Sequence, residues 1–306
     1  MSREVAIIGD GMVGSTIAYT LFLRRSADVI TLIDTNRPKA ESDALDMMHA
    51  VSLLGGPAVR AGGYQHLDSA DVIVITASVP GRNISSRDEL LAGNAKLFST
   101  ICSEIKPHLN PKAVITVVSN PLDVIAHLVQ KLLDIEPERV VGTGTLLESS
   151  RLRYATSQRI GCHPQDVNAM TVGEHGDRAV ALTDEASVGG IEIADLIDEP
   201  LDELSNETVN GGYQVQSGKG YTNFGVAGAA CVLVESILAD SHRVLPVCSY
   251  DKDLGIYISS PTEISREGAV RHLHPKMSLE EKKRFKASIV AIRSNCQLAD
   301  STLEKK

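Results

Sequence analysis

Residues 5–14 read VAIIGDGMVG and give the strongest structural signal in the chain. Residues 5–8 form a short, continuous apolar run, which is typical of a strand buried in a parallel sheet. A Gly-x-Gly-x-x-Gly motif follows at once, and residues 15–23 then have helical spacing. A strand, a glycine-rich turn and a helix in this order predict a dinucleotide-binding unit. The alternative is a glycine-rich turn in an unrelated α/β protein.

The three glycines of the motif have separate roles in such a unit. Gly9 permits the tight turn, Gly11 lets the backbone approach a pyrophosphate, and Gly14 lets the helix pack closely on the strand. The first helical residues, Met12 and Val13, belong to a helix N-terminus that faces the phosphates. These five residues are therefore predicted to bind the cofactor.

An acidic residue follows the second predicted strand. Residues 29–33 form a β run that ends at Asp34, twenty positions after Gly14. A carboxylate here accepts hydrogen bonds from both ribose hydroxyls and repels a 2′-phosphate. The predicted cofactor is therefore NAD rather than NADP.

Strands and helices continue to alternate up to residue 142. This alternation predicts an α/β fold, a doubly wound Rossmann-type parallel sheet with helices on both faces. Ligand contacts in such folds lie where the strands end. The further cofactor candidates follow predicted strands and are Tyr64, Thr76, Ala77, Ser78, Ser119 and Asn120. For Tyr64, which would flank an adenine, an aromatic side chain in a surface loop is the alternative.

Composition limits the class of protein. The chain has 306 residues, 43% of them hydrophobic, and a net charge of −9 without long basic runs, so nucleic acid and anionic membranes are poor partners. Five widely spaced cysteines without a C-x-x-C pair indicate reduced thiols in a cytoplasmic protein, with no zinc site. We expect no metal, no signal peptide and no membrane span.

The character of the sequence changes after residue 143. We expect a cofactor domain over residues 1–143 and an α+β substrate domain with mainly antiparallel strands over 144–306. A helix over 146–160 carries Glu148 and Arg151, three positions apart on one face, for which a surface ion pair is the alternative. A strand over 167–172 leads into His175, which two glycines flank. The remaining expected elements are a strand over 184–188, an acidic connection over 191–206, helices over 207–217, 223–238 and 278–298, and strands near 244–250 and 255–259.

Six motifs in order resemble the lactate/malate dehydrogenase family over essentially the whole chain. They are GDGMVG with Asp34, SRDELL, VSNPLDV, GTGTLLESSRLR, VGEHGD and GKGYTNFGVA. The resemblance implies hydride transfer between a nicotinamide cofactor and a small 2-hydroxy or 2-oxo acid. It also implies a homodimer or homotetramer.

The resemblance assigns roles to individual residues. His175 is implied to be the proton donor and acceptor, and Glu148 to hold the other imidazole nitrogen. Arg151 is implied to bind the substrate carboxylate with its planar fork, and Arg87 to polarise the carbonyl from a closing loop. Asn120 and Thr222 are implied to line the substrate site.

The chain departs from the family pattern at two positions. The usual aspartate partner of the histidine is Glu148 here. The main specificity position, six residues before Arg87, is Gly81, where lactate enzymes typically have Gln and malate enzymes Arg. Gly81 argues against oxaloacetate and leaves room for a larger uncharged group, although the neighbouring Arg82 keeps malate open. The resemblance thus favours an L-lactate dehydrogenase-type enzyme, with L-2-hydroxyisocaproate or malate dehydrogenase as alternatives.

Some bacterial lactate enzymes bind fructose 1,6-bisphosphate through an arginine and a histidine. Arg153 falls at the arginine position, but Asn168 stands at the histidine position, so we expect weak or absent activation. Two hypotheses from other functional classes remain as alternatives to the dehydrogenase. One is an NAD- and metal-dependent glycosidase, and the other is a non-enzymatic NAD-binding sensor.

Overall fold

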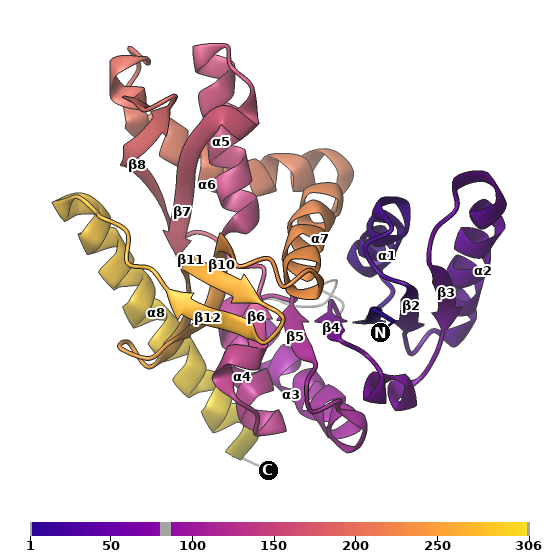
Figure 1. Ribbon diagram of the computed structural model, residues 1–306. Coiled ribbons are helices and arrows are strands. Elements are labelled where there is room, and N and C mark those ends of the chain that lie inside the picture. The colour runs from indigo at the N-terminus through magenta and orange to yellow at the C-terminus, as the bar shows by residue number, and fades with distance from the viewer. Residues whose placement is uncertain (1, 80–86, 305–306) are drawn as a thin grey trace.

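The computed structural model describes residues 2–79 and 87–304, apart from the side chains at positions 87 and 88. A single sheet passes through the described part of the molecule, in the order β3-β2-β1-β4-β5-β6-β10-β11-β7-β8-β9, with β12 paired to β11 (Figure 1). Its first half confirms the predicted parallel sheet. The strands of this half are β1 (Glu4–Ile8), β2 (Val29–Ile33), β3 (Ala58–Ala61), β4 (Val72–Ile75), β5 (Val114–Val117) and β6 (Val140–Gly142).

The strand order brings β1 and β4 together at the point where the chain reverses direction across the sheet. Both strands are parallel, with Val5 opposite Val72 and Ile8 opposite Ile75. A doubly wound sheet opens a crevice at the carboxyl ends of such a strand pair. The residues after Ile8, Ile33 and Ile75 therefore meet at one edge of the sheet.

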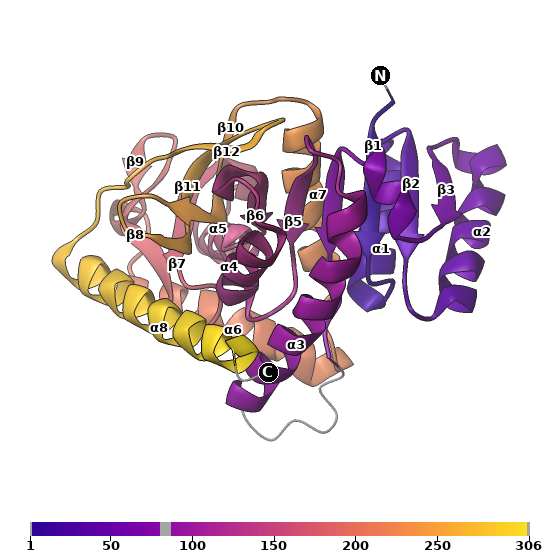
Figure 2. The ribbon, with the colours of Figure 1, turned by 90° about the horizontal axis from the view of Figure 1, so that it is seen from below.

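Side chains alternate along β1, so that this central strand contributes to a hydrophobic core on each face of the sheet. Val5 and Ile7 face the core shared with α1 (Met12–Arg24), α2 (Arg37–Leu54) and α7 (Phe224–Leu238). Ala6 and Ile8 face the opposite core. That second core is formed with α3 (Arg87–Ile105), α4 (Leu122–Leu133) and α8 (Leu279–Glu304). In Figure 1, α1 and α7 lie above the parallel strands and α3 and α4 lie below them. Figure 2 shows α8 running from the antiparallel strands towards α3.

The second half of the chain joins the same sheet by antiparallel pairing. Cys248 on β10 pairs with Gly142 on β6, and Ser259 on β11 pairs with Gly173 on β7. Its elements are α5 (Leu146–Ile160), β7 (Val167–Gly173), β8 (Ala179–Val188), β9 (Ile191–Glu192), α6 (Leu201–Lys219), β10 (Arg243–Asp251), β11 (Ile256–Ser265) and β12 (Gly268–His272). Short 3-10 helices are η1 (Tyr64–Asp68), η3 (Lys106–His108), η4 (Pro137–Arg139), η5 (Pro164–Asp166) and η6 (Ile193–Asp195). The division into domains at residue 143 stays a prediction, since the sheet continues across it.

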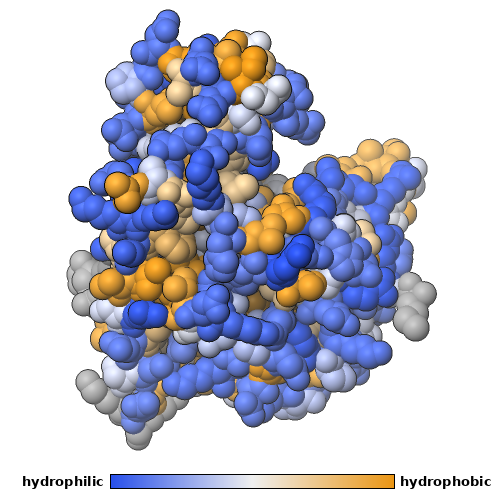
Figure 3. Space-filling view, turned by 60° about the vertical axis from the view of Figure 1, so that its left-hand side comes forward, coloured by the Kyte–Doolittle hydropathy of each residue, from blue (hydrophilic) through white to orange (hydrophobic). Residues whose placement is uncertain are grey.

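A projecting lobe is formed by α5, α6, β7 and β8, which share a small core of their own (Figure 1). The space-filling view shows the surface hollowed where this lobe meets the rest of the molecule (Figure 3). The site described below is built on this lobe and on the ends of the parallel strands.

Several boundaries in the second half differ from the predictions. The expected connection over 191–206 instead contains β9, η6 and the start of α6 at Leu201. The sequence there is polar and α6 buries only Leu204, Ser205 and Thr208, so its helical pattern is weak and packing against α5 stabilises it. In addition, β8 begins at Ala179, β11 and α8 extend further than expected, and β12 was not predicted.

Candidate active site

The glycine-rich turn after β1 has the geometry that its motif requires. Gly9 has a φ of 101°, and a Cβ there would lie 2.7 Å from the backbone nitrogen of Ala77. A Cβ at Gly14 would lie 1.9 Å from the carbonyl oxygen of Gly9, so helix α1 packs directly on the turn. A Cβ at Gly11, in contrast, would meet nothing within 4 Å. The turn is therefore closely packed behind Gly11 and open in front of it.

The N-terminus of α1 faces this open side. Gly11 is its N-cap residue and supplies no side-chain cap to the first N–H groups, and Met12 is exposed. Uncapped N–H groups at the start of a helix attract phosphate through hydrogen bonding and the helix dipole. The space before Gly11 and the uncapped helix fit a dinucleotide pyrophosphate.

Asp34 is held at the end of β2 by two backbone donors. Its Oδ2 accepts a hydrogen bond from the Asp10 N–H at 2.6 Å, and its Oδ1 accepts one from the Asn36 N–H at 2.7 Å. The carboxylate remains partly exposed, so it retains lone pairs for a ribose. Tyr64, the first residue of η1, is half-buried against the core, unlike the surface-loop alternative, and burial raises the pKa of its phenol.

Hydrogen bonds join the ends of β1, β4 and β5. The Thr76 hydroxyl donates to the Gly9 carbonyl at 2.6 Å, and the Ser119 hydroxyl donates to the Ala77 carbonyl at 2.6 Å. The structure thus brings Gly9, Thr76, Ala77 and Ser119 of the predicted cofactor residues together at one edge of the sheet. Ser78 directly follows Ala77 in this segment.

Asn94 on α3 was not predicted from the sequence, yet it ties two of these segments together. Its side-chain amide donates to the Asn120 carbonyl at 2.6 Å and accepts from the Val79 N–H at 2.9 Å. The residue is fully buried. A lone asparagine on the apolar face of a helix was the available signal, because a buried amide needs such partners.

His175 lies in the turn between β7 and β8. The flanking glycines both have positive φ, 92° at Gly173 and 116° at Gly176, so the turn depends on their lack of a side chain. The imidazole Nδ1 lies 3.1 Å from Oε1 of Glu148, on the first turn of α5. Nη1 of Arg151, one turn further along α5, lies 3.7 Å from the same oxygen. Glu148 is only 4% exposed, so this ion pair exists but does not lie at the surface, as the alternative interpretation of the sequence had placed it.

The glutamate contacts the imidazole at ion-pair distance without an aligned hydrogen bond. Within the described part of the chain, neither Nδ1 of His175 nor Oε2 of Glu148 has a hydrogen-bond partner. Burial by itself would lower the pKa of His175, but the charge of Glu148, assisted by that of Asp123, raises the pKa to about 9. The same contact holds the pKa of Glu148 below its usual value in spite of burial. The contact therefore favours the charged form of both side chains.

Asp123 is a second carboxylate beside His175 and was not predicted from the sequence. It is buried on the first turn of α4, and its Oδ2 accepts a hydrogen bond from the His175 backbone N–H at 2.9 Å. Burial raises the pKa of Asp123 to about 6, although the His175 N–H and charge oppose the shift. Its place in the VSNPLDV motif, three residues after Asn120, was the available signal.

Only some of the other predicted substrate residues lie within the described part of the chain. Gly81 and the neighbouring Arg82 lie outside the described residues, and Arg87 begins α3 with its side chain outside them. Thr222 lies in the short connection between α6 and α7. The next residue, Asn223, donates to the Thr16 hydroxyl of α1 at 3.0 Å and so ties this connection to the cofactor half.

Two family models match almost the whole chain. The NAD-binding domain of lactate/malate dehydrogenase matches residues 3–142, and the alpha/beta C-terminal domain of lactate/malate dehydrogenase matches residues 145–302. The chain belongs to the lactate/malate dehydrogenase family. It is accordingly an NAD-dependent oxidoreductase that acts on the CH–OH group of a 2-hydroxy acid, which confirms the predicted family, fold, cofactor and reaction class.

Relatives from both branches of the lactate/malate dehydrogenase family resemble this chain. A probable L-lactate dehydrogenase from Schizosaccharomyces pombe is 34% identical, over 95% of this chain and 92% of the relative. A malate dehydrogenase from Rhodopirellula baltica is 35% identical, over 98% of each chain. A solved lactate dehydrogenase from Cryptosporidium parvum, complexed with lactic acid and NAD, has a TM-score of 0.93 at 30% identity, over 98% of each chain.

The malate branch is also represented among solved structures of the family. The malate dehydrogenase from Picrophilus torridus has a TM-score of 0.95 at 30% identity, over 100% of this chain and 99% of that one. Overall similarity therefore does not separate the lactate branch from the malate branch, and the choice between them depends on the site. In the described residues, no helix is long and apolar enough to cross a membrane.

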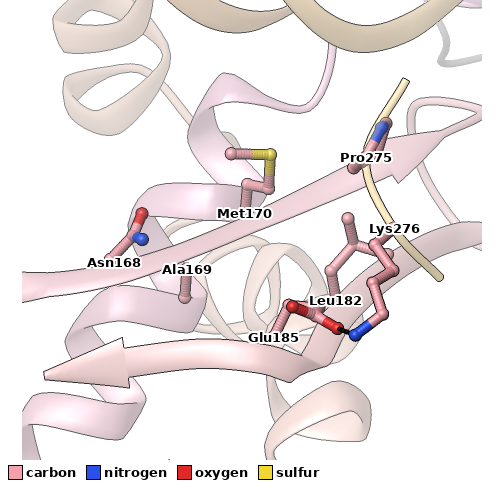
Figure 4. A pocket seen from close by; sticks show the side chains of 7 residues that line it. All are labelled: Asn168, Ala169, Met170, Leu182, Glu185, Pro275 and Lys276. Carbon is pink, nitrogen blue, oxygen red and sulfur yellow. Dashed lines mark ion pairs between the residues drawn. The ribbon is translucent and has the colours of Figure 1, made fainter. Parts of the chain in front are cut away.

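A further cavity of about 250 Å³ lies between β7, β8 and the segment before α8, on the lobe that carries His175 (Figure 4). Its lining includes Asn168, and across it Lys276 forms an ion pair with Glu185 at 2.6 Å. Arg153, on α5, donates from Nε to the carbonyl of Ala169, the neighbour of Asn168, at 2.8 Å. Arg153 therefore bonds to the residue next to Asn168. The two residues considered for phosphate binding lie close together in the structure.

Proposed function

We propose that this enzyme is an L-lactate dehydrogenase-type L-2-hydroxyacid dehydrogenase, which reduces pyruvate with NADH to L-lactate and accepts larger 2-oxo acids. The observation that carries the proposal is the contact of His175 with Glu148 beside Arg151, at 3.1 and 3.7 Å. It combines an imidazole whose pKa is raised with a guanidinium on the same lobe. A 2-oxo acid needs both, a proton for its carbonyl oxygen and a cation for its carboxylate.

The residues divide the chemistry among them. When bound, NADH supplies the hydride that reduces C2 of the 2-oxo acid. His175 donates a proton to the carbonyl oxygen, and Glu148 stabilises the imidazolium before that transfer. Arg151 binds the carboxylate, Arg87 stabilises the negative charge that develops on the carbonyl oxygen, and Asn120 and Thr222 line the site. In the oxidative direction a neutral His175 accepts the proton.

The cofactor is assigned to the edge of the parallel sheet. Gly9, Gly11 and Gly14, with Met12 and Val13, would hold the pyrophosphate. Asp34 would hold the adenine ribose and Tyr64 would flank the adenine. The residues at the ends of β4 and β5, from Thr76 to Ser78 and at Ser119 and Asn120, would line the nicotinamide half.

Substrate preference is tested by NADH oxidation with pyruvate, 2-oxoisocaproate, phenylpyruvate and oxaloacetate. We expect pyruvate and the apolar acids to exceed oxaloacetate in kcat/KM by at least about tenfold, because Gly81 offers no counter-ion to a second carboxylate. A preference for oxaloacetate would contradict the proposal and assign Arg82 the counter-ion role. A preference for phenylpyruvate over pyruvate would show that Gly81 enlarges the site.

Two controls address the other classes of protein. Loss of activity on removal of divalent metal with a chelator would favour the glycosidase, and a His175→Asn variant that kept all activity would favour a sensor.

We also propose a cytoplasmic homodimer or homotetramer. Exposed apolar side chains on α1 and α2, among them Tyr19, Leu23 and Leu45, support self-association. Light scattering after gel filtration measures the oligomeric state.

A further inference from the structure

Helix α6 contains two adjacent glycines in its interior, Gly211 and Gly212. Glycine is a poor residue for a helix interior, where each costs roughly 1 kcal/mol relative to alanine. Neither has a positive φ, so backbone conformation does not require glycine at these positions. The pair therefore needs another physical reason.

The glycine pair lies against the side chain of Arg151. A Cβ at Gly211 would lie 3.1 Å from Cδ of Arg151, and a Cβ at Gly212 would lie 3.3 and 3.4 Å from its two terminal nitrogens. Such contacts are tighter than ordinary packing, so a methyl group at either position would displace the Arg151 side chain by a few tenths of an ångström. The absence of a side chain lets Arg151 lie directly on the backbone of α6.

The same helix offers a comparison. Gly218 also lies within α6, but a Cβ there would meet nothing within 4 Å. Packing therefore does not require glycine at position 218. It favours glycine at positions 211 and 212, which lie against Arg151.

Arg151 also forms an ion pair with Glu148. Nη1 lies 3.7 Å from Oε1 of Glu148, which in turn contacts His175. The Arg151 side chain is 22% exposed, so part of it remains open to a ligand. A shift of the guanidinium away from α6 changes its place relative to both Glu148 and a bound carboxylate.

We propose that Gly211 and Gly212 are positioning residues, which form a glycine seat that sets where the Arg151 fork meets the substrate carboxylate. The proposal rests on the proposed function, in which Arg151 binds that carboxylate. A fork that binds a carboxylate through two parallel hydrogen bonds depends on its orientation. The seat thus acts on substrate affinity through Arg151 and touches no reacting atom.

The test replaces Gly212 and Gly211 with alanine in the full-length enzyme. We expect Gly212→Ala to raise the KM for pyruvate roughly 3- to 10-fold, with a smaller change in kcat, because misplaced binding groups weaken substrate orientation. The KM for NADH stays unchanged, and Tm stays equal or rises because alanine favours the helix. The matched control, Gly218→Ala, leaves the KM for pyruvate unchanged.

A double-mutant cycle with Arg151→Lys separates the seat from a general effect on the lobe. Because the seat acts through Arg151, Gly212→Ala should add less than about twofold to the KM of the Arg151→Lys enzyme. An unchanged KM for pyruvate in Gly212→Ala, or an equal factor in both backgrounds, overturns the seat while leaving the proposed function intact. An Arg151→Lys enzyme with an unchanged KM overturns the role of Arg151, and the seat with it.

Discussion

At the scale of single residues, the proposed mechanism depends on the contact between one pair of side chains. His175 and Glu148 stand 27 positions apart in the chain and meet at 3.1 Å. The charge of Glu148 outweighs the burial of His175, and the pKa of the imidazole rises to about 9. An acid with such a pKa is charged at neutral pH and ready to donate its proton to a carbonyl oxygen.

The raised pKa predicts opposite pH dependence for the two directions. Pyruvate reduction requires protonated His175, so its kcat/KM should fall as pH rises through about 9. Lactate oxidation requires the neutral form, so its kcat/KM should rise over the same range. Initial rates from pH 6 to 10 in both directions measure this.

A Glu148→Gln variant is the control for the cause of the shift. Loss of the carboxylate should move the apparent pKa of His175 to lower pH by at least about one unit, since the opposing charge is removed. A wild-type profile with its midpoint near the ordinary histidine value would contradict the assignment, as would a variant profile that does not move.

At the scale of elements, the start of α4 connects the cofactor edge of the sheet with the turn that contains His175. The carbonyl of Asn120, just before α4, accepts from Asn94, and Asp123 on its first turn accepts from the His175 N–H at 2.9 Å. The two contacts are separated by three positions, so a displacement of the helix start would move both halves of the site together.

Substitutions of Asp123 test whether its hydrogen bond positions the turn that contains His175. Asp123→Ala leaves a His175 N–H without its acceptor, which should cost about 1–3 kcal/mol in unfolding free energy. The kcat for pyruvate should fall at least about tenfold as the imidazole loses its position. Asp123→Asn keeps an acceptor and should lose less of both. Urea unfolding, kcat and NADH affinity are measured together, and an unchanged kcat in Asp123→Ala would refute this role.

At the scale of the whole molecule, the projecting lobe carries both the turn that contains His175 and the separate cavity beside Asn168 (Figure 4). Asn168, which stands where the family resemblance implies a histidine that binds phosphate, is neutral. In the same cavity the charge of Lys276 is already neutralised by Glu185. A phosphate entering this cavity would therefore meet a carboxylate and no unpaired lysine.

We therefore expect fructose 1,6-bisphosphate to leave the KM for pyruvate unchanged within about twofold, because Asn168 supplies no positive charge to join that of Arg153. Steady-state rates with and without millimolar ligand, at fixed NADH, provide the measurement. A severalfold decrease in KM at micromolar ligand would show that Arg153 suffices without a histidine. An Arg153→Gln variant would then establish whether the effect depends on that residue.

Local patterns in the sequence determined much of this protein. The buried run before Gly9, the spacing of the three glycines and the acid at Asp34 predicted the parallel sheet and its cofactor, because these signals lie within one strand–turn–helix unit. The glycines around His175 likewise predicted an open turn. Each of these features depends on neighbours in the chain, which the sequence displays directly.

Contacts between distant segments were decided only by the tertiary structure. Asn94, Asp123 and the glycine pair of α6 acquire their roles from partners that lie 26, 52 and about 60 positions away. The extent of α6 and the presence of β12 depended on packing rather than on local propensity, so their patterns were weak. The pKa of His175 could not be predicted from the sequence either, because the pKa of an imidazole depends on the groups that surround it in space.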